Sequence, residues 1–197
     1  MTFISDSLNR IKPSATMVIT AKATQLKREG KKVIGLSSGE PDFDTPQHVK
    51  QAAIDAINSG YTKYTNIEGI PELRQSIVEK FKKDNDLNYD VSNVIVGTGG
   101  KQILFNALMS SLNKDDEVII PAPYWVSYPD MTLLAGGKPI FVDCSSETNF
   151  KLTGEALDKV ITKNSKWLIL NSPSNPTGSC YSISELEEIA NVVRKHE

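Results

Sequence analysis

The sequence is poor in the residues that build metal sites and disulfides. Its two cysteines, Cys144 and Cys180, occur in no CxxC spacing, so we expect free thiols rather than a disulfide. His48 and His196 are isolated, so a metal site made of side chains has little support. No window approaches the roughly 18 apolar residues of a membrane span, and the first residues lack the apolar run of a signal peptide. These absences predict a cytoplasmic protein.

The sequence also lacks an excess of either charge. There are 22 Lys and Arg residues against 24 Asp and Glu residues, which gives a net charge of -2. This balance creates no overall field that would favour nucleic acid or an anionic membrane. The 197 residues and 39% hydrophobic content suit one packed domain, or a domain with a small appendage. Small molecules are therefore the expected partners.

Helices dominate the predicted first half of the chain. One helix is predicted over residues 14–29, a second begins with Thr45 as its cap and Pro46 in its first turn, and a third begins at Pro71. A short strand is predicted at residues 33–36. This order leaves the first half without a clear sheet.

From residue 93 onward, short apolar strands alternate with amphipathic helices. The predicted strands cover residues 94–97, 117–120, 139–142 and 167–170, and the predicted helices cover residues 101–112, 126–135, 153–161 and 184–195. This alternation predicts an α/β fold, with a mostly parallel sheet and helices on both faces. With four strands and a helix at the end, the sheet looks truncated before it is complete.

Capping signals mark the last helix. Ser184 and Glu187 fit a capping box, in which each side chain bonds the backbone of the other residue. The inward stripe of this helix is predicted to contain Ile183, Leu186, Ile189 and Val193.

Several segments carry candidate ligand-binding groups. Gly99 and Gly100 lie between a predicted strand and a helix, where free amides and the helix dipole attract an anion, although an ordinary tight turn explains them equally well. Trp125 and Asn175 each follow another predicted strand. Because parallel strands end at the same edge of a sheet, we expect these groups to converge on one cleft. The alternative for Trp125 is a core anchor.

Five motifs in order resemble class I pyridoxal-phosphate aminotransferases. They are GEPDF at 39–43, YTKYTNIEGIPELR at 61–74, GTGGKQ at 97–102, PYWVSYP at 123–129 and NSPSNPTG at 171–178. KPSAT at 12–16 is similar to the bacterial aspartate aminotransferases that also accept prephenate. The resemblance implies a fold type I pyridoxal-phosphate transferase. Residues 1–45 would form an N-terminal arm and part of the small domain, and residues 46–197 the N-terminal part of the large cofactor-binding domain.

The resemblance assigns cofactor and substrate contacts to individual residues. Gly39 would offer its N–H to the substrate α-carboxylate, and Gly100 with Lys101 would bind the phosphate of pyridoxal 5'-phosphate. Trp125 would stack on the pyridine ring, and Asn175 would donate to the phenolic oxygen of the cofactor. Each of these contacts is implied by the match of motifs.

Further contacts are implied at the edges of the site. Tyr64 would reach the phosphate of the neighbouring subunit's cofactor, which implies a homodimer with shared sites. Thr16 and Lys101 would recognise the distal carboxylate of the substrate, and Lys12 matches the position associated with prephenate. Either lysine is equally well explained as a solvated surface residue. The Asn175-Pro176 peptide bond is a candidate for the cis form.

No catalytic residue is assigned in this chain. In the family, the lysine that binds the cofactor, the acid beside the pyridine nitrogen, a tyrosine and the arginine for the α-carboxylate follow the segment matched here. We therefore expect the N-terminal half of an aminotransferase, which transfers the amino group of aspartate to 2-oxoglutarate, or to prephenate, by a ping-pong mechanism. Alone, the chain would bind the cofactor weakly and without turnover.

Two alternatives remain open. One is a non-catalytic fragment that binds pyridoxal phosphate or another protein. The other is an unrelated nucleotide-binding α/β domain that uses Gly99 and Gly100 as its phosphate loop and Asp143 as its acidic residue. The second alternative leaves Trp125, Asn175 and the Tyr64 segment unexplained.

Overall fold

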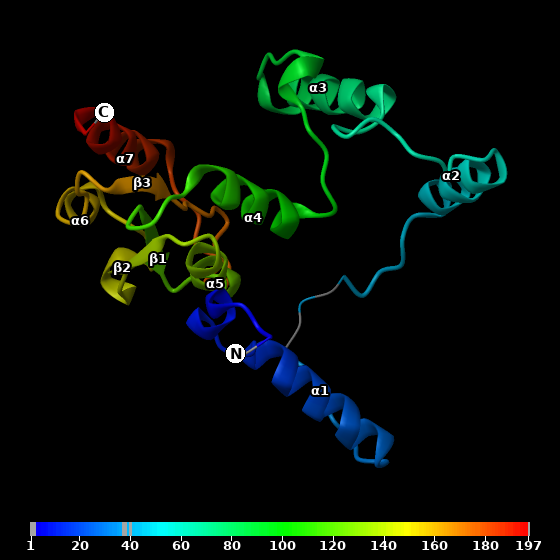
Figure 1. Ribbon diagram of the computed structural model, residues 1–197, viewed down its shortest axis with the longest axis horizontal. Helices are drawn as coiled ribbons and strands as arrows, with labels where there is room; N and C mark the ends of the chain where they lie inside the picture. Colours follow the sequence, from blue (N-terminus) through cyan, green and yellow to red (C-terminus); the bar gives the residue numbers. More distant parts are fainter. Residues whose placement is uncertain (1–2, 37–38, 40, 197) are drawn as a thin grey trace. The chain divides into compact units, whose positions relative to one another are not determined.

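The computed structural model describes residues 3–36, 39 and 41–196 (Figure 1). Glu40 of the motif at 39–43 therefore lies outside the described residues. Cys144 is buried and Cys180 is exposed, and both are free thiols, as predicted. Across the described ranges, no helix is long and apolar enough to cross a membrane, and no cluster of three or more His, Cys, Asp or Glu could hold a metal ion.

The chain forms two compact units. One contains Met1–Ser14 and Leu104–Glu197, and the other contains Ala15–Ile103. The predicted boundary at residue 45 between small and large domains remains a prediction.

The unit Ala15–Ile103 is helical. It contains α1 (Ala15–Arg28), α2 (Gln47–Asn58), α3 (Pro71–Asn85), the short η2 (Val91–Asn93) and the first residues of α4 (Gly100–Ser111), which confirms the predicted helices. Thr45 was predicted to cap α2, but the N-cap residue is Pro46. The N–H of Thr45 instead donates to the carboxylate of Asp44 at 2.9 Å, so Thr45 is part of a local turn before the helix.

Residues 33–36 and 94–97 were predicted as strands, and both predictions are wrong. Val94 has an extended backbone, but the sheet pairs of the described residues involve other segments. Its carbonyl accepts a hydrogen bond from the side chain of Arg74, and the N–H of Val96 donates to the carbonyl of Glu68. Since a strand is defined by pairing with a neighbour, apolar composition alone was not sufficient here.

The described residues form a three-stranded parallel sheet in the other unit. Its strands are β1 (Glu117–Ala122), β2 (Lys138–Asp143) and β3 (Ser165–Leu168), in the order β2-β1-β3. Both pairings of β1 are parallel, with Ile119 opposite Ile140 on one side and Leu168 on the other. This confirms the predicted α/β fold. The third strand begins and ends two residues earlier than predicted.

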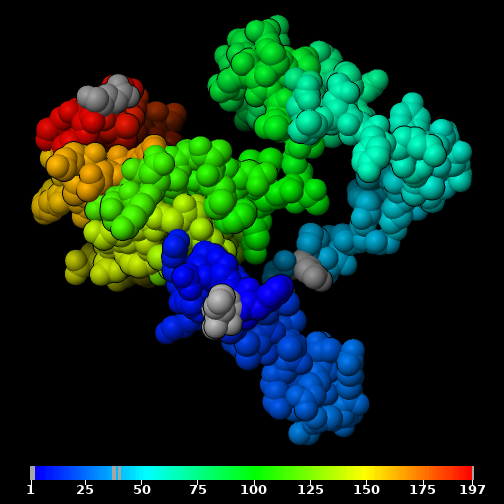
Figure 2. Space-filling model, in the orientation of Figure 1, coloured from blue at the N-terminus to red at the C-terminus, as the bar shows by residue number. Residues whose placement is uncertain are grey.

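Helices bury both faces of the central strand. Val118 and Ile120 pack with Leu108 of α4 and Met131 of α5 (Ser127–Leu134). On the opposite face, Ile119 packs in the second cluster with residues of α6 (Gly154–Asp158) and α7 (Ile183–Lys195). Alternate residues of a strand point to opposite faces, so β1 contributes to two cores at once. Figure 2 shows the residues of β2, α6 and α7, coloured yellow to red, packed against one another.

The capping box of α7 lies two residues before the predicted one. Ser182 and Glu185 exchange the two capping bonds, so the prediction of Ser184 and Glu187 is wrong. Ser182 with Glu185 and Ser184 with Glu187 both have the spacing of a capping box. Glu185 also forms an ion pair with Lys151, which favours the first of these two pairs. The predicted inward stripe is correct at Ile189, which is 4% exposed, but wrong at Ile183, Leu186 and Val193, which are exposed.

A hydrogen-bonded loop connects β3 with α7. The side-chain oxygen of Asn171 accepts the N–H of Asn175 at 2.9 Å, and the hydroxyl of Ser172 accepts the N–H of Tyr181 at 3.2 Å. The phenol oxygen of Tyr181 in turn accepts the N–H of Leu152 at 2.8 Å. The Asn175-Pro176 bond is cis, as predicted. The loop thus holds its shape through its own polar groups and one contact to the core.

We expect the Glu185→Gln substitution to destabilise the protein at pH 7 and to have little effect near pH 2. Hydrogen bonding to Lys151, followed by the N–H of Ser182, lowers the pKa of Glu185 to about 2 from its ordinary 4.5. A carboxyl group with a lowered pKa stabilises the fold above its unfolded value, and this contribution disappears as the pH falls towards the folded value. Urea unfolding midpoints at several pH values measure the effect. Glu187→Gln in the same helix is the control, and a Glu185→Gln deficit that did not shrink on acidification would contradict the expectation.

We expect Asn171→Ala to loosen the loop at Asn175. Loss of one hydrogen-bond acceptor typically costs about 1 kcal/mol, so the amide of Asn175 should exchange its hydrogen at least about fivefold faster. Asn171→Asp keeps an acceptor oxygen at the same position and should preserve slow exchange. Hydrogen exchange followed by NMR measures both variants, and equal protection in wild type and Asn171→Ala would show that the bond does not hold the loop.

Candidate functional site

Trp125 and Asn175 lie at the same edge of the sheet. Trp125 follows the carboxyl end of β1, and Asn175 follows the carboxyl end of β3. Because the two strands are parallel neighbours, their ends are adjacent. A cavity of about 20 Å³ lies where the two loops meet, and its lining includes Tyr124, Tyr128, Asn171 and Asn175. Asn175 lines this cavity and Trp125 does not, and the two residues share the edge of the sheet through the order of their strands.

The indole of Trp125 is half-buried and rests on the core. It packs against the cluster of α4, β1 and α5 and meets the ring of Tyr128 edge-on, with centroids 5.4 Å apart and planes at 87°. Burial raises the pKa of the Tyr128 phenol, so this ring stays neutral. Trp125 is thus a core anchor that still presents surface at the sheet edge, and its stacking on the cofactor stays a prediction.

The side chain of Asn175 is exposed, whereas its backbone is held by Asn171. An amide group at this position can donate to an oxygen atom of a ligand without breaking the loop. The asparagine that follows residues 167–170 was predicted to support Asn175, and the bond to the side chain of Asn171 confirms this. An Asx side chain directly after a strand commonly bonds backbone four or fewer residues away.

Gly100 and Lys101 are the first two residues of α4. Gly99 precedes them with a φ of +82°, and a Cβ built on Gly99 or Gly100 would meet no atom of the neighbouring described residues within 4 Å. The side chain of Gln102 accepts the N–H of Thr98. This open, glycine-rich helix start fits an anion such as a phosphate.

The other predicted contacts are spread over the two units. Gly39 and Tyr64 are exposed, and Thr16 is half-buried in the first turn of α1. Together with Gly100 and Lys101 they belong to the unit Ala15–Ile103, so their convergence with Trp125 and Asn175 stays a prediction. Gly99 and Gly100 were predicted to join this site because they would follow a strand of the sheet. That argument was wrong, since residues 94–97 are not a strand of the sheet.

Lys12 is exposed and belongs to the same unit as the sheet. It follows η1 (Asp6–Arg10), whose last residue, Arg10, donates to the carbonyl of Leu133 in α5 at 3.2 Å. This contact fixes the N-terminal segment to a helix that covers the sheet.

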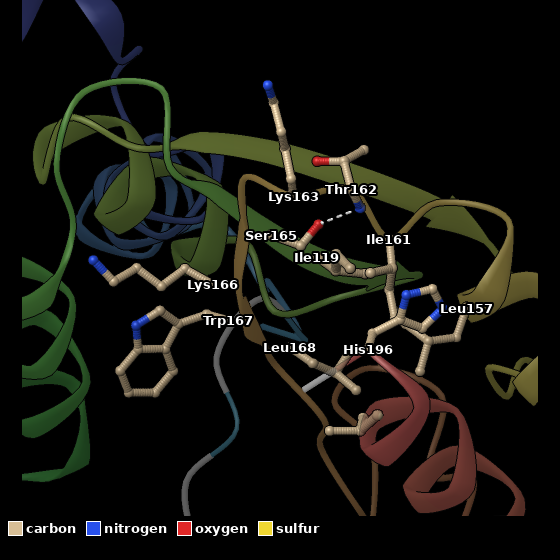
Figure 3. A pocket seen from close by; sticks show the side chains of 11 residues that line it. Ile119, Leu157, Ile161, Thr162, Lys163, Ser165, Lys166, Trp167, Leu168 and His196 are labelled. Atoms are coloured by element: carbon tan, nitrogen blue, oxygen red, sulfur yellow. Dashed lines mark hydrogen bonds between the residues drawn. The ribbon is translucent and has the colours of Figure 1, made fainter.

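A larger cavity lies beside β3, and none of the predicted site residues line it. It has a volume of about 320 Å³ and is bordered by β3, α6 and α7. Figure 3 shows Ile119, Leu168 and Leu157 around it, with the hydrogen bond from Thr162 to Ser165 at its rim. Its apolar walls are parts of the second core cluster, and it carries no constellation that suggests chemistry.

The buried carboxylate of Glu117 serves the fold rather than the candidate site. It starts β1, at the opposite end from Trp125, and accepts a hydrogen bond from Thr162 at 2.6 Å. That bond, with Lys138 and Ser165, lowers the pKa of Glu117 although burial opposes the shift. The charge is thus fully engaged at the amino edge of the sheet.

Comparisons with known proteins identify relatives of the whole chain. The family model described as aminotransferase class I and II matches residues 31–197. A Rickettsia bellii protein named "probable aspartate/prephenate aminotransferase" is 61% identical over 196 residues, which cover 100% of this chain and 49% of that protein. The aspartate/prephenate aminotransferase of Cereibacter sphaeroides is 58% identical over the same length, also 49% of its own.

Solved structures of aspartate aminotransferases are also similar to this chain. The aspartate aminotransferase of Rhizobium meliloti has a TM-score of 0.94 and 48% identity, covering 100% of this chain and 49% of its own. The aspartate aminotransferase of Thermus thermophilus with maleate has a TM-score of 0.96 and 45% identity, covering 100% of this chain and 52% of its own. The chain spans about half the length of the curated relatives it matches. From its sequence, its parallel α/β fold and the family model, the chain belongs to the aminotransferase class I and II family.

Proposed function

We propose that the protein carrying this chain is a pyridoxal-phosphate aminotransferase that moves the amino group of aspartate to 2-oxoglutarate, with prephenate as an alternative acceptor. The observation that carries the proposal is that Trp125 and Asn175 follow β1 and β3, two neighbouring parallel strands, at the carboxyl edge of one sheet. The names of the relatives and the family support the reaction and the substrates. Maleate, in the Thermus structure, is a dicarboxylate, which supports a dicarboxylate substrate.

The residues fit the cofactor in three respects. The open glycine start of α4, with Gly100 and Lys101, suits a phosphate, because helix N-termini attract anions. The indole of Trp125 offers a flat surface for a pyridine ring, a stacking contact worth about 0.5 to 1.5 kcal/mol beyond its buried area. The exposed amide of Asn175 can donate to the phenolic oxygen and stabilise negative charge there.

Substrate recognition would use residues of the unit Ala15–Ile103. Gly39 would donate its N–H to the α-carboxylate, and Thr16 and Lys101 would hold the distal carboxylate. When bound, pyridoxal phosphate supplies an electron sink that lets a proton leave the α-carbon of the amino acid. Tyr64 would contact the phosphate bound by a neighbouring subunit, so the working form would be a homodimer. Its high exposure of 107% in this single chain is compatible with a role between subunits.

The assay is amino transfer by the protein at its natural length. With pyridoxal phosphate present, aspartate and 2-oxoglutarate should yield oxaloacetate and glutamate, and initial rates should give parallel reciprocal plots, as a ping-pong mechanism requires. Cofactor binding without glutamate formation would identify a non-catalytic binding protein. If the protein neither bound pyridoxal phosphate nor formed glutamate, the proposal would be overturned.

Asn175→Ala should lower kcat/KM for aspartate about 10- to 100-fold, because a hydrogen bond to a charged group contributes about 1.5 to 3 kcal/mol. Asn164→Ala is the matched control, since Asn164 precedes the same strand at the opposite edge of the sheet. Steady-state kinetics measures both variants. An Asn175→Ala enzyme as active as the control would remove this residue from the site.

Lys12→Met should reduce kcat/KM for prephenate about two- to fivefold and leave 2-oxoglutarate nearly unaffected, because exposed charge pairs contribute about 0.2 to 1 kcal/mol. Lys27→Met, in the last turn of α1, controls for loss of one surface charge. Competition between the two acceptors provides the ratio, and an unchanged ratio would assign Lys12 to the solvated surface.

A further inference from the structure

The guanidinium of Arg74 joins three separate stretches of the unit Ala15–Ile103. Arg74 lies in the first turn of α3, and its side chain is 12% exposed. Its Nε donates to the carbonyl of Val94 at 2.9 Å, and its Nη2 donates to the carbonyl of Val91 at 2.6 Å. Its Nη1 lies 3.6 Å from the carboxylate of Glu68. The planar fork of donors in arginine allows one side chain to serve several acceptors.

Independent contacts hold the same joint without Arg74. The N–H of Val96 donates to the carbonyl of Glu68 at 2.9 Å. Gly69 has a φ of +105°, and a Cβ at this position would lie 2.9 Å from the Cγ2 atom of Val96. Residues 68–69 therefore lie directly against residues 94–96. A side chain at position 69 would separate the two segments, so the close approach depends on glycine.

The two joined segments are those that carry the proposed phosphate contacts. Tyr64 precedes Glu68 by four residues, and Gly99 and Gly100 follow Val96 within four residues. Gly97 continues the fixed path, since a Cβ there would meet Ile103 at 2.5 Å. The chain between Val94 and α4 thus has little freedom once Val94 is held.

We propose that Arg74 is a positioning residue for phosphate binding, which holds the segment leading into Gly99 and Gly100 against the loop that carries Tyr64. Arg74 contacts neither the cofactor nor the substrate in this role, and acts through the backbone of Val91 and Val94. The proposal rests on the proposed function, because it assumes that the start of α4 receives the cofactor phosphate.

The test compares two ligands that differ only in the phosphate. Dissociation constants of pyridoxal 5'-phosphate and of pyridoxal are measured for the full-length protein and its variants. Arg74→Lys keeps the charge but loses the fork, so affinity for pyridoxal 5'-phosphate should fall about tenfold. Affinity for pyridoxal should change less than twofold. A residue that merely stabilises the fold would lower both affinities together or neither.

Two further variants keep the result decisive. Glu68→Gln removes the partly exposed ion pair but keeps the backbone carbonyl of residue 68, so it should change the ratio of the two affinities less than twofold. Gly69→Ala opens the joint while leaving Arg74 intact and should lower the ratio as Arg74→Lys does. If Arg74→Lys does not fold, Gly69→Ala decides.

The outcomes separate the inference from the function on which it rests. A wild-type preference for pyridoxal 5'-phosphate that persists in folded Arg74→Lys and Gly69→Ala overturns the positioning role and leaves the proposed function intact. No wild-type preference for the phosphorylated ligand overturns the phosphate site itself. A preference lost in these variants and kept in Glu68→Gln supports the role of Arg74.

Discussion

Burial of β1 on both of its faces is the constraint on which the sheet-bearing unit depends. Val118 and Ile120 have no exposed surface and face α4 and α5, while Ile119 faces the opposite cluster. Parallel strands require both faces to be covered. Here α5 and α6 lie in the crossovers that parallel pairing demands, while α4 precedes β1 and α7 follows β3. The loops at the carboxyl ends are therefore attached to the most rigid part of this unit. That placement gives Trp125 and Asn175 fixed starting points although both have exposed surface.

The two units hold their loops by different means. In the sheet-bearing unit, the loop of Asn175 is fixed by short-range side-chain bonds from Asn171 and Ser172, with Tyr181 reaching Leu152. In the helical unit the described residues form no sheet. There the side chain of Arg74 donates the hydrogen bonds that a paired strand would otherwise supply. Arg74 satisfies carbonyl groups that would otherwise need a neighbouring strand, which is why an apolar segment remains extended without pairing.

The sequence predicted the helices, the parallel sheet and the edge shared by Trp125 and Asn175, because period and strand order determine these features locally. The prediction failed where two short sequence patterns fitted the same feature equally well, as at the start of α7. Ser182 and Ser184 each have a glutamate three residues later, and only the distant partner Lys151 selects Glu185. Residues 94–97 are as apolar as β1, but strand formation depends on a neighbour that composition cannot reveal. The role of Arg74 depends on the carbonyl groups of Val91 and Val94, which are distant in the sequence, so no local side-chain pattern predicted it.

The contact between Gly69 and Val96 has a consequence for how this chain can change over generations. A left-handed backbone and the absence of room for even one carbon atom act together at position 69. Substitution there is opposed by the backbone itself, before any selection for a ligand acts. In a library of random variants screened only for soluble expression, this position would be depleted of replacements, although no contact with the cofactor is assigned to it. A residue that tolerates no replacement can therefore be needed for the packing of a loop as readily as for binding or catalysis.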